Sequence, residues 1–97
     1  MPFKLSFSNT AADTIAQLEK HNKPKHKKVA KALGYLELNP RHQSLKTHEY
    51  SDLEGPKKEK VFEAYAENDT PGAYRIFFCY PMGEKGVIHV IAITPHP

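Results

Sequence analysis

The chain has 97 residues, of which 39% are hydrophobic and 26% are charged, and its formal net charge at pH 7 is +3. These values are typical of globular proteins, argue against wholesale disorder, and predict a single domain over residues 1–97 with one modest core. No apolar stretch approaches the roughly 20 residues of a membrane span and no signal peptide opens the sequence, so we expect a cytoplasmic protein with no membrane partner.

The first half of the chain predicts one strand followed by two helices. Apolar and polar residues alternate over residues 3–7, which is the period of a half-buried strand. Ser8, Asn9 and Thr10 then offer helix-capping side chains, and apolar residues at helical spacing follow for about three turns. Pro24 suits the first turn of a second helix, which Asn39 and Pro40 end. The two helices are expected to form a basic helical hairpin.

The second half predicts three strands, over residues 60–67, 74–80 and 87–94, separated by short turn sequences. Short turns between consecutive strands indicate antiparallel pairing. The expected fold is therefore α+β, in the order β-α-α-β-β-β, with the helical hairpin packed on one face of a twisted antiparallel sheet. Because the helices can cover only one face, the other face is expected to be free to bind.

Strand periodicity divides the side chains of residues 74–80 between the two faces of the sheet. Ile76 and Phe78 point one way, whereas Arg75, Phe77 and Cys79 point the other. If the helices cover the Ile76 side, Arg75 emerges on the open face. Both faces are apolar, so periodicity alone leaves this choice open. Cys79 lies in an apolar run, and we interpret it as a core residue rather than a nucleophile.

Positive charge is concentrated in the first half of the chain. Residues 1–48 carry nine Lys or Arg and three acidic residues, whereas residues 49–97 carry five Lys or Arg and eight acidic residues. A basic cluster favours a polyanionic partner, because phosphate contacts release counterions. A solvated helix face is an equally good interpretation of a lysine run. The candidate RNA-binding residues are Lys25, Lys27, Lys28, Lys31, Arg41 and Lys60.

Taken together, these features resemble the RelE/ParE superfamily of toxins from bacterial toxin–antitoxin systems. The resemblance covers nearly the whole chain. It rests on the opening strand with Ser8, the basic helical hairpin, the stretch 39–46 (NPRHQSLK), the strand that begins Tyr74-Arg75-Ile76-Phe77, and the terminal strand before His96. In that family, the ribonuclease members cut messenger RNA, usually on the ribosome, and other members inhibit DNA gyrase. Both kinds are neutralised by a partner antitoxin.

The resemblance also implies roles for individual residues. Arg75 matches the arginine that ribonuclease members use on the scissile phosphate, and His96 resembles a near-terminal histidine that acts as general acid in one branch. Lys46 stands where the family often has a basic residue after the second helix. Two positions depart from that branch: Pro97 replaces a terminal tyrosine, and Gln43 stands in place of a glutamate thought to act as base.

Metal-free RNA cleavage needs a base for the 2′-hydroxyl proton, a cation for the phosphorane and an acid for the leaving 5′-oxygen. Arg75 suits the cation and His96 the acid, whereas the base is either His48 (first choice) or Glu63. Each residue also has a purely structural interpretation: Arg75 could pair with Glu63 across neighbouring strands, His48 could be a surface histidine, and His96 a frayed terminus. The histidines show no ligand spacing, so we expect no metal and no cofactor.

We therefore expect a metal-independent endoribonuclease that cleaves mRNA by attack of the 2′-hydroxyl on the adjacent phosphate. Its catalytic candidates are Arg75, His96, His48 and Lys46. The expected partners are mRNA, the ribosome and a cognate antitoxin, with the toxin monomeric or in a toxin–antitoxin hetero-oligomer. The alternative function is a ParE-like gyrase inhibitor, or a catalytically silent toxin relative that acts as a binding module.

Overall fold

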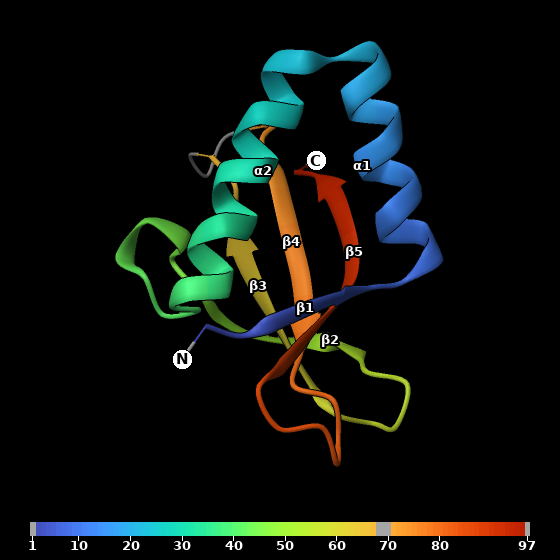
Figure 1. The fold of residues 1–97 in the computed structure, drawn as a ribbon, viewed down its shortest axis with the longest axis vertical. Coiled ribbons are helices and arrows are strands. Elements are labelled where there is room, and N and C mark those ends of the chain that lie inside the picture. The colour runs from blue at the N-terminus through green and yellow to red at the C-terminus, as the bar shows by residue number, and fades with distance from the viewer. Residues whose placement is uncertain (1, 68–70, 97) are drawn as a thin grey trace.

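The computed structural model describes residues 2–67 and 71–96 as two helices packed on one sheet (Figure 1). The elements are β1 (Lys4–Phe7), α1 (Asn9–His21), α2 (Lys23–Leu38), a 3-10 turn η1 (Gln43–Leu45), β2 (His48–Glu54), β3 (Lys60–Tyr65), β4 (Tyr74–Cys79) and β5 (Val87–Pro95). Within the described ranges, neither helix combines the length and the apolar character that crossing a bilayer requires.

Side-chain caps at both helix starts explain why the hairpin begins and turns where it does. The Ser8 hydroxyl accepts a hydrogen bond from the Ala11 amide at 3.0 Å, and the Asn22 side chain accepts one from the Lys25 amide at 3.3 Å. Asn22 is also the C-cap of α1, so one residue ends the first helix and starts the second. This confirms the predicted helical hairpin.

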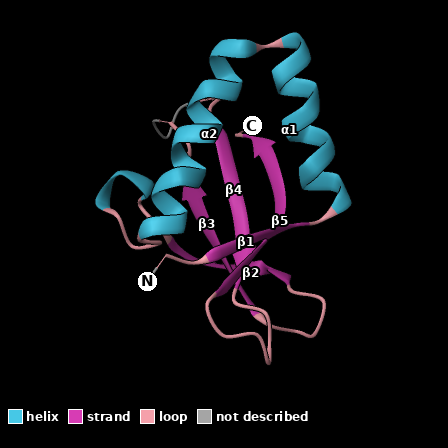
Figure 2. Ribbon diagram, viewed as in Figure 1, coloured by secondary structure: helices cyan, strands magenta, loops and turns pink. Residues whose placement is uncertain are grey.

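The sheet has the strand order β1-β5-β4-β3-β2, and the predicted α+β architecture is confirmed (Figure 2). Two details differ from the expectation. β1 runs parallel to β5, so the sheet is mixed rather than wholly antiparallel. In addition, β2 was not predicted, because it is an edge strand whose side chains are almost all exposed and which therefore lacks an alternating apolar pattern.

The main core lies between the helical hairpin and one face of the sheet. Ile76 and Phe78 are fully buried there against Val29 and Leu36 of α2, in a cluster that also holds residues of α1, β3 and β5. Phe77 belongs to a second cluster on the opposite face, together with Cys79 and Val61. This answers the question that periodicity left open, because the helices cover the Ile76 side and Arg75 lies on the opposite face.

The face away from the helices is less open than expected. The β2–β3 hairpin folds over part of it: the Tyr50 and Phe77 ring centroids lie 4.8 Å apart, and Cys79 is fully buried. A Cβ on Gly55 would meet the Glu59 carboxylate and the Cys79 sulfur, so a larger residue here would require both side chains to shift.

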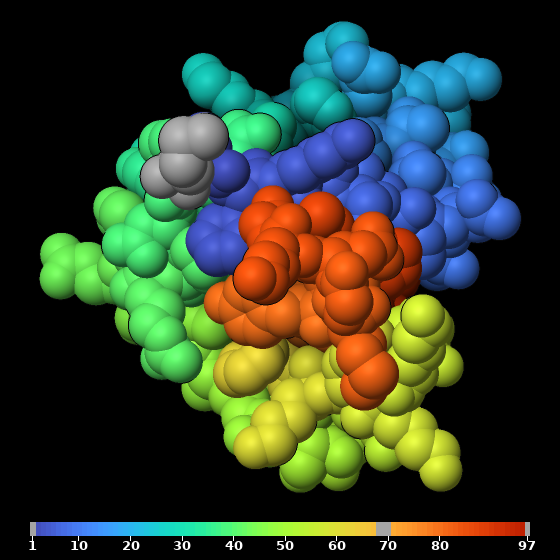
Figure 3. All heavy atoms as spheres, turned by 60° about the horizontal axis from the view of Figure 1, so that its bottom comes forward, coloured from blue at the N-terminus to red at the C-terminus, as the bar shows by residue number. Residues whose placement is uncertain are grey.

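Glu59 ties the covering hairpin to the neighbouring β4–β5 connection. Its carboxylate accepts hydrogen bonds from the backbone amides of Lys57 at 2.7 Å and Met82 at 3.0 Å. These bonds lower the pKa of Glu59, the Met82 amide having the largest effect. In Figure 3 the two connections protrude next to each other, the first in yellow-green and the second in orange. Only the part of the open face near Arg75 therefore remains as a candidate site.

Candidate active site

Glu63 is the centre of a polar cluster on the helix-free face of the sheet. Its side chain is 4% exposed, and its two oxygens accept from three neighbours. Arg75 Nη1 lies 3.0 Å from Oε2, His48 Nε2 lies 2.7 Å from Oε1, and the Tyr65 hydroxyl donates to Oε1 at 3.3 Å. Burying a carboxylate is costly unless it is paired, and here two basic side chains satisfy it. The cluster contains two of the predicted catalytic residues, Arg75 and His48.

His48 is held through both of its ring nitrogens. Its Nδ1 lies 2.9 Å from the Lys46 carbonyl oxygen, and its Nε2 faces the carboxylate of Glu63. Both partners are oxygen atoms that can accept a hydrogen bond, so neither ring nitrogen points into open space. This position favours His48 as a residue that orients Glu63.

Arg75 keeps donors available after it has bonded to Glu63. Its guanidinium lies over the Phe77 ring, 4.9 Å from the centroid, and is 16% exposed. Among the described residues, its buried Nε has no acceptor, and the same holds for the buried Oγ1 of Thr94, which pairs with Arg75 in the β4–β5 ladder. A guanidinium has five N–H donors in a planar fork, which suits the oxygens of a phosphate.

His96 follows directly after β5 and next to the start of β4. Its amide donates to the Ala73 carbonyl at 2.7 Å, and its carbonyl accepts from the Gly72 amide at 2.9 Å. Arg75 pairs with Thr94, two residues before His96. The backbone thus brings His96 to the end of the sheet that carries Arg75. Its role as acid stays a prediction.

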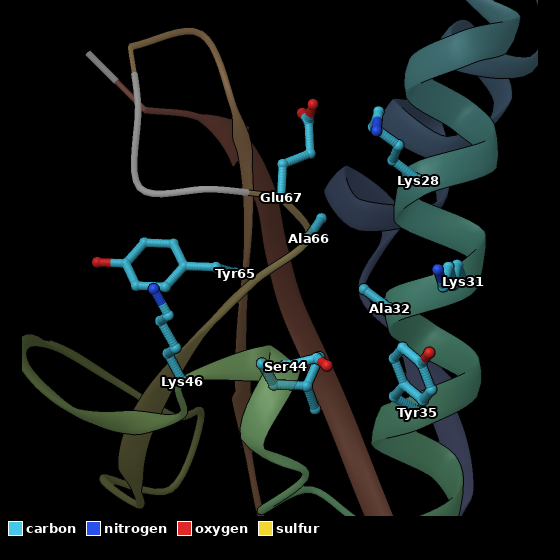
Figure 4. Close-up of a pocket in the computed structure, with 10 residues that line it drawn as sticks. Lys28, Lys31, Ala32, Tyr35, Ser44, Lys46, Tyr65, Ala66 and Glu67 are labelled. Carbon is cyan, nitrogen blue, oxygen red and sulfur yellow. The ribbon is translucent and has the colours of Figure 1, made fainter.

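Lys46 stands between this cluster and a basic cleft. It follows η1 in a left-handed conformation, with φ at 48°, which is unusual for a residue other than glycine. The adjoining cleft has a volume of about 360 Å³ and lies between α2 and the end of β3 (Figure 4). Its lining residues are Lys28, Lys31, Ala32, Tyr35, Ser44, Leu45, Lys46, Tyr65, Ala66 and Glu67.

Two of the candidate RNA-binding lysines are engaged in ion pairs. Lys25 bonds both carboxylate oxygens of Glu67, at 3.0 and 2.8 Å. Burial alone would raise the pKa of Glu67, but the hydrogen bond from Lys25 and one from the Tyr74 amide lower it overall. Lys60 lies 3.9 Å from Glu49 in an exposed pair outside the cluster.

The remaining candidates divide between the cleft and the outer surface. Lys28 and Lys31 line the cleft, whereas Lys27 and Arg41 are exposed away from it. Gln43 is exposed at the start of η1. The structure thus brings Lys28, Lys31 and Lys46 together and leaves the other basic candidates outside.

Tyr65 was not among the predicted site residues, because an aromatic residue in an apolar strand is normally a packing residue. It bonds to Glu63 and also lines the cleft, so it joins the two parts of the site. The available signal was strand periodicity, which places Tyr65 and Glu63 on one face. Across residues 2–67 and 71–96, no three His, Cys, Asp or Glu side chains gather closely enough to hold a metal ion.

Comparison with known proteins gives a fold but no sequence relative. No protein-family model and no curated protein matches the chain. A YoeB/ParE toxin structure from Agrobacterium tumefaciens matches with a TM-score of 0.70 and 14% identity, covering 97% of this chain and 99% of the other. The YoeB dimer from Staphylococcus aureus matches with a TM-score of 0.65 and 13% identity over the whole of both chains. The chain therefore has a RelE/ParE-type toxin fold.

Proposed function

We propose that this chain is the toxin of a toxin–antitoxin pair and acts as a metal-independent endoribonuclease on mRNA, on the ribosome. Its fold is that of YoeB/ParE toxins, which supports the toxin assignment. The observation that carries the chemical part is the Arg75–Glu63 contact of 3.0 Å beside the basic cleft. It joins a phosphate-binding cation and a proton acceptor in one place.

In the proposed reaction, Arg75 holds the scissile phosphate with the donors that Glu63 does not use. Glu63 takes the proton of the 2′-hydroxyl, and the 2′-oxygen attacks the adjacent phosphorus. The bond from phosphorus to the 5′-oxygen breaks, and His96 gives the leaving oxygen its proton. The products are a 2′,3′-cyclic phosphate and a 5′-hydroxyl. Lys46 adds positive charge near the phosphorane.

Glu63 is preferred over His48 as the base because both nitrogens of His48 face acceptors. His48 is then a positioning residue, which holds the carboxylate with one N–H donor. His48→Gln keeps such a donor, so it should retain most of the cleavage rate that His48→Ala loses. An equal loss of cleavage rate in both variants would instead indicate that His48 itself transfers a proton.

A cell-free translation system tests the proposal directly. Wild-type protein should produce discrete mRNA fragments that end in a 2′,3′-cyclic phosphate and begin with a 5′-hydroxyl. Arg75→Ala should reduce the cleavage rate by about 10²–10³-fold and His96→Ala by about 10²–10⁴-fold. Lys85→Ala, on the exposed β4–β5 connection, controls for the loss of a positive charge. Wild-type rates in both site variants would remove these residues from the mechanism.

One observation favours the alternative, a ParE-like gyrase inhibitor or a catalytically silent binding module. Glu63 already neutralises Arg75, so the ion pair can also be read as part of the structure. This alternative predicts intact mRNA in the translation system. DNA breaks that require gyrase would identify the inhibitor, and the absence of both activities would identify the silent relative.

The antitoxin part of the proposal has its own test. A short neighbouring reading frame that encodes a DNA-binding protein with an acidic segment should form a complex with this chain and abolish its activity. The basic helical hairpin offers charge for such a partner, and the edges of the sheet offer unpaired backbone groups. Full activity of the co-purified complex would contradict neutralisation.

A further inference from the structure

Arg75 and Thr94 each carry a buried polar atom that has no hydrogen-bond partner. These atoms are Nε of Arg75 and Oγ1 of Thr94, and both are unsatisfied within the part of the chain that the structure describes. The two residues form a direct pair in the β4–β5 ladder. Buried polar groups in folded proteins are nearly always hydrogen-bonded, so two unsatisfied ones on paired residues point to a second state in which they are satisfied.

A bulge in β5 places Thr94 beside Arg75. The register of the β4–β5 ladder shifts between Phe77 and Phe78, because Ile91 is an extra residue in β5. In an unshifted register, Arg75 would pair with the isoleucine that precedes Thr94, which belongs to the core beneath the helices. Bulges are common next to active sites, where they re-aim a side chain.

Backbone and side-chain contacts of Ser8 hold this bulge. The Ser8 hydroxyl donates to the Ile91 carbonyl at 2.6 Å, and the Ser8 amide donates to the Val90 carbonyl at 3.0 Å. Ser8 is also the N-cap of α1, so the start of the helix and the bulge share one anchor. The placement of Thr94 beside Arg75 is therefore built into the fold.

Glu63 draws the guanidinium of Arg75 away from Thr94. The strand β4 lies between β3 and β5 (Figure 1). Arg75 Nη1 bonds Glu63 on β3 at 3.0 Å, whereas Thr94 lies on β5. A threonine hydroxyl can accept a hydrogen bond, and Nε carries an N–H donor, so the two unsatisfied atoms are chemically matched. The pull toward β3 explains why they do not meet in this structure.

A phosphate on Arg75 would oppose the pull of Glu63. Phosphate oxygens accept several donors of a planar guanidinium at once, so they compete with the carboxylate for the cation. A small movement of the guanidinium toward β5 then brings Nε to the Thr94 hydroxyl and satisfies both buried atoms. No outside group has to reach them, which agrees with their burial.

We propose that Thr94 is a positioning residue for the scissile phosphate and acts through Arg75. In the phosphate-bound state, its hydroxyl accepts a hydrogen bond from Arg75 Nε and thereby orients the outer N–H donors toward the phosphate. Glu63 shares the cation less closely in that state, which leaves its carboxylate to take the 2′-hydroxyl proton. This inference rests on the proposed function and adds the residue that orients its arginine.

NMR spectroscopy of the arginine side chains tests this contact without catalysis. The sequence has two arginines, Arg41 and Arg75, so Arg41→Lys assigns the two Nε–H signals. Saturation with inorganic phosphate should shift the Arg75 signal downfield in wild type and in Thr94→Ser, which keeps the hydroxyl. In Thr94→Val, which keeps the shape of the side chain, this shift should be absent. An equal shift in Thr94→Val, or no shift in wild type, would overturn the proposal.

Cleavage kinetics test whether the contact serves the reaction. Loss of a hydrogen bond to a charged group should lower kcat/KM for mRNA cleavage by roughly 10- to 100-fold in Thr94→Val. Thr94→Ser should retain most of the rate. In an Arg75→Lys background, which lacks the Nε–H donor, Thr94→Val should have no further effect. An equal loss in both backgrounds would assign Thr94 a structural role that is independent of Arg75.

Thr14→Val is the matched control for the loss of a threonine hydroxyl. Thr14 lies on α1, and its hydroxyl already donates to the Thr10 carbonyl at 3.1 Å. This variant should cleave mRNA and shift the Arg75 signal like wild type. Urea unfolding verifies that each variant is folded under the assay conditions.

These outcomes separate the Thr94 contact from the proposed function. A phosphate-induced shift that depends on the Thr94 hydroxyl, together with no mRNA cleavage by wild type, would retain the contact and reject the nuclease. Cleavage by wild type that Thr94→Val leaves unchanged would reject the contact and retain the nuclease.

Discussion

Arg75 on β4 contacts Glu63 on the neighbouring strand β3 along a diagonal. In the β3–β4 ladder, Arg75 pairs with Tyr65 and Glu63 pairs with Phe77, yet Arg75 Nη1 lies 3.0 Å from Glu63 Oε2. The guanidinium crosses the Phe77 ring on its way, 4.9 Å from the centroid. Both residues lie on the face that the helices leave uncovered. Their contact sets how many donors Arg75 keeps for a phosphate and how Glu63 is oriented.

Replacing Glu63 should separate its charge from its packing. Glu63→Gln keeps hydrogen bonding to Arg75 but removes the proton acceptor, so mRNA cleavage should fall by about 10²–10⁴-fold while the protein stays folded. Glu63→Ala leaves Arg75 unpaired and 16% exposed, which should lower the free energy of unfolding by about 3 kcal/mol. Urea unfolding and cleavage assays measure the two effects. Wild-type cleavage by Glu63→Gln would show that another group is the base.

Lys46 offers a test of function without loss of stability. Its left-handed conformation costs about 1 kcal/mol for a side chain other than glycine, and glycine adds an entropic cost of about the same size in the unfolded chain. Lys46→Gly should therefore change the free energy of unfolding little, while RNA binding and cleavage fall because the ammonium is gone. Lys46→Ala keeps the strain and loses the charge, so it should be the less stable of the two. Wild-type cleavage in both variants would exclude a catalytic contribution of Lys46.

The Lys25–Glu67 ion pair should make stability depend on pH in the acid range. The pKa of Glu67 is lower in the folded protein than its ordinary value of 4.5, because Lys25 and the Tyr74 amide outweigh the effect of burial. Folding is thus stabilised above pH 4.5 and the contribution is lost as pH falls through the lower, folded-state pKa. Glu67→Gln should be less stable than wild type at pH 7, and the difference should disappear in acid. Glu84→Gln, on an exposed loop, controls for the loss of one negative charge. A difference that persists unchanged at low pH would assign the effect to packing.

Cys79 should react with thiol reagents only when the protein opens. The side chain is fully buried, and burial raises its pKa to about 11, with Glu59 adding a smaller increase. At pH 8 only about one thiol in a thousand is then ionised, and the thiolate is the reactive form. Iodoacetamide should leave the native protein unmodified and label it fully in guanidinium chloride. Rapid labelling of the native protein would show that the β2–β3 hairpin does not stay closed over β4.

Local sequence signals were sufficient for most of the fold. Ser8 caps the first helix within the predicted capping stretch, because a cap depends only on the backbone within three residues. β3, β4 and β5 were predicted from their apolar content and from the turn residues between them, which are also local signals. β2 was missed because an exposed edge strand is held by pairing with β3 rather than by its own pattern.

The sequence by itself supplied the candidates for phosphate binding and proton transfer: Arg75 and Lys46 through the resemblance to the RelE/ParE superfamily, and His48 through the chemistry of its side chain. Only the tertiary structure decided which of these residues lie in contact and on which face of the sheet. Periodicity divided the side chains of β4 between two faces. Only the packed structure shows which face the helices cover, and therefore that Arg75 lies on the uncovered one. The choice of Glu63 over His48 as base depends on two contacts of His48, and the cleft is lined by residues of α2, of η1 and of the end of β3. Such contacts join residues far apart in the chain, and no local pattern in the sequence encodes them.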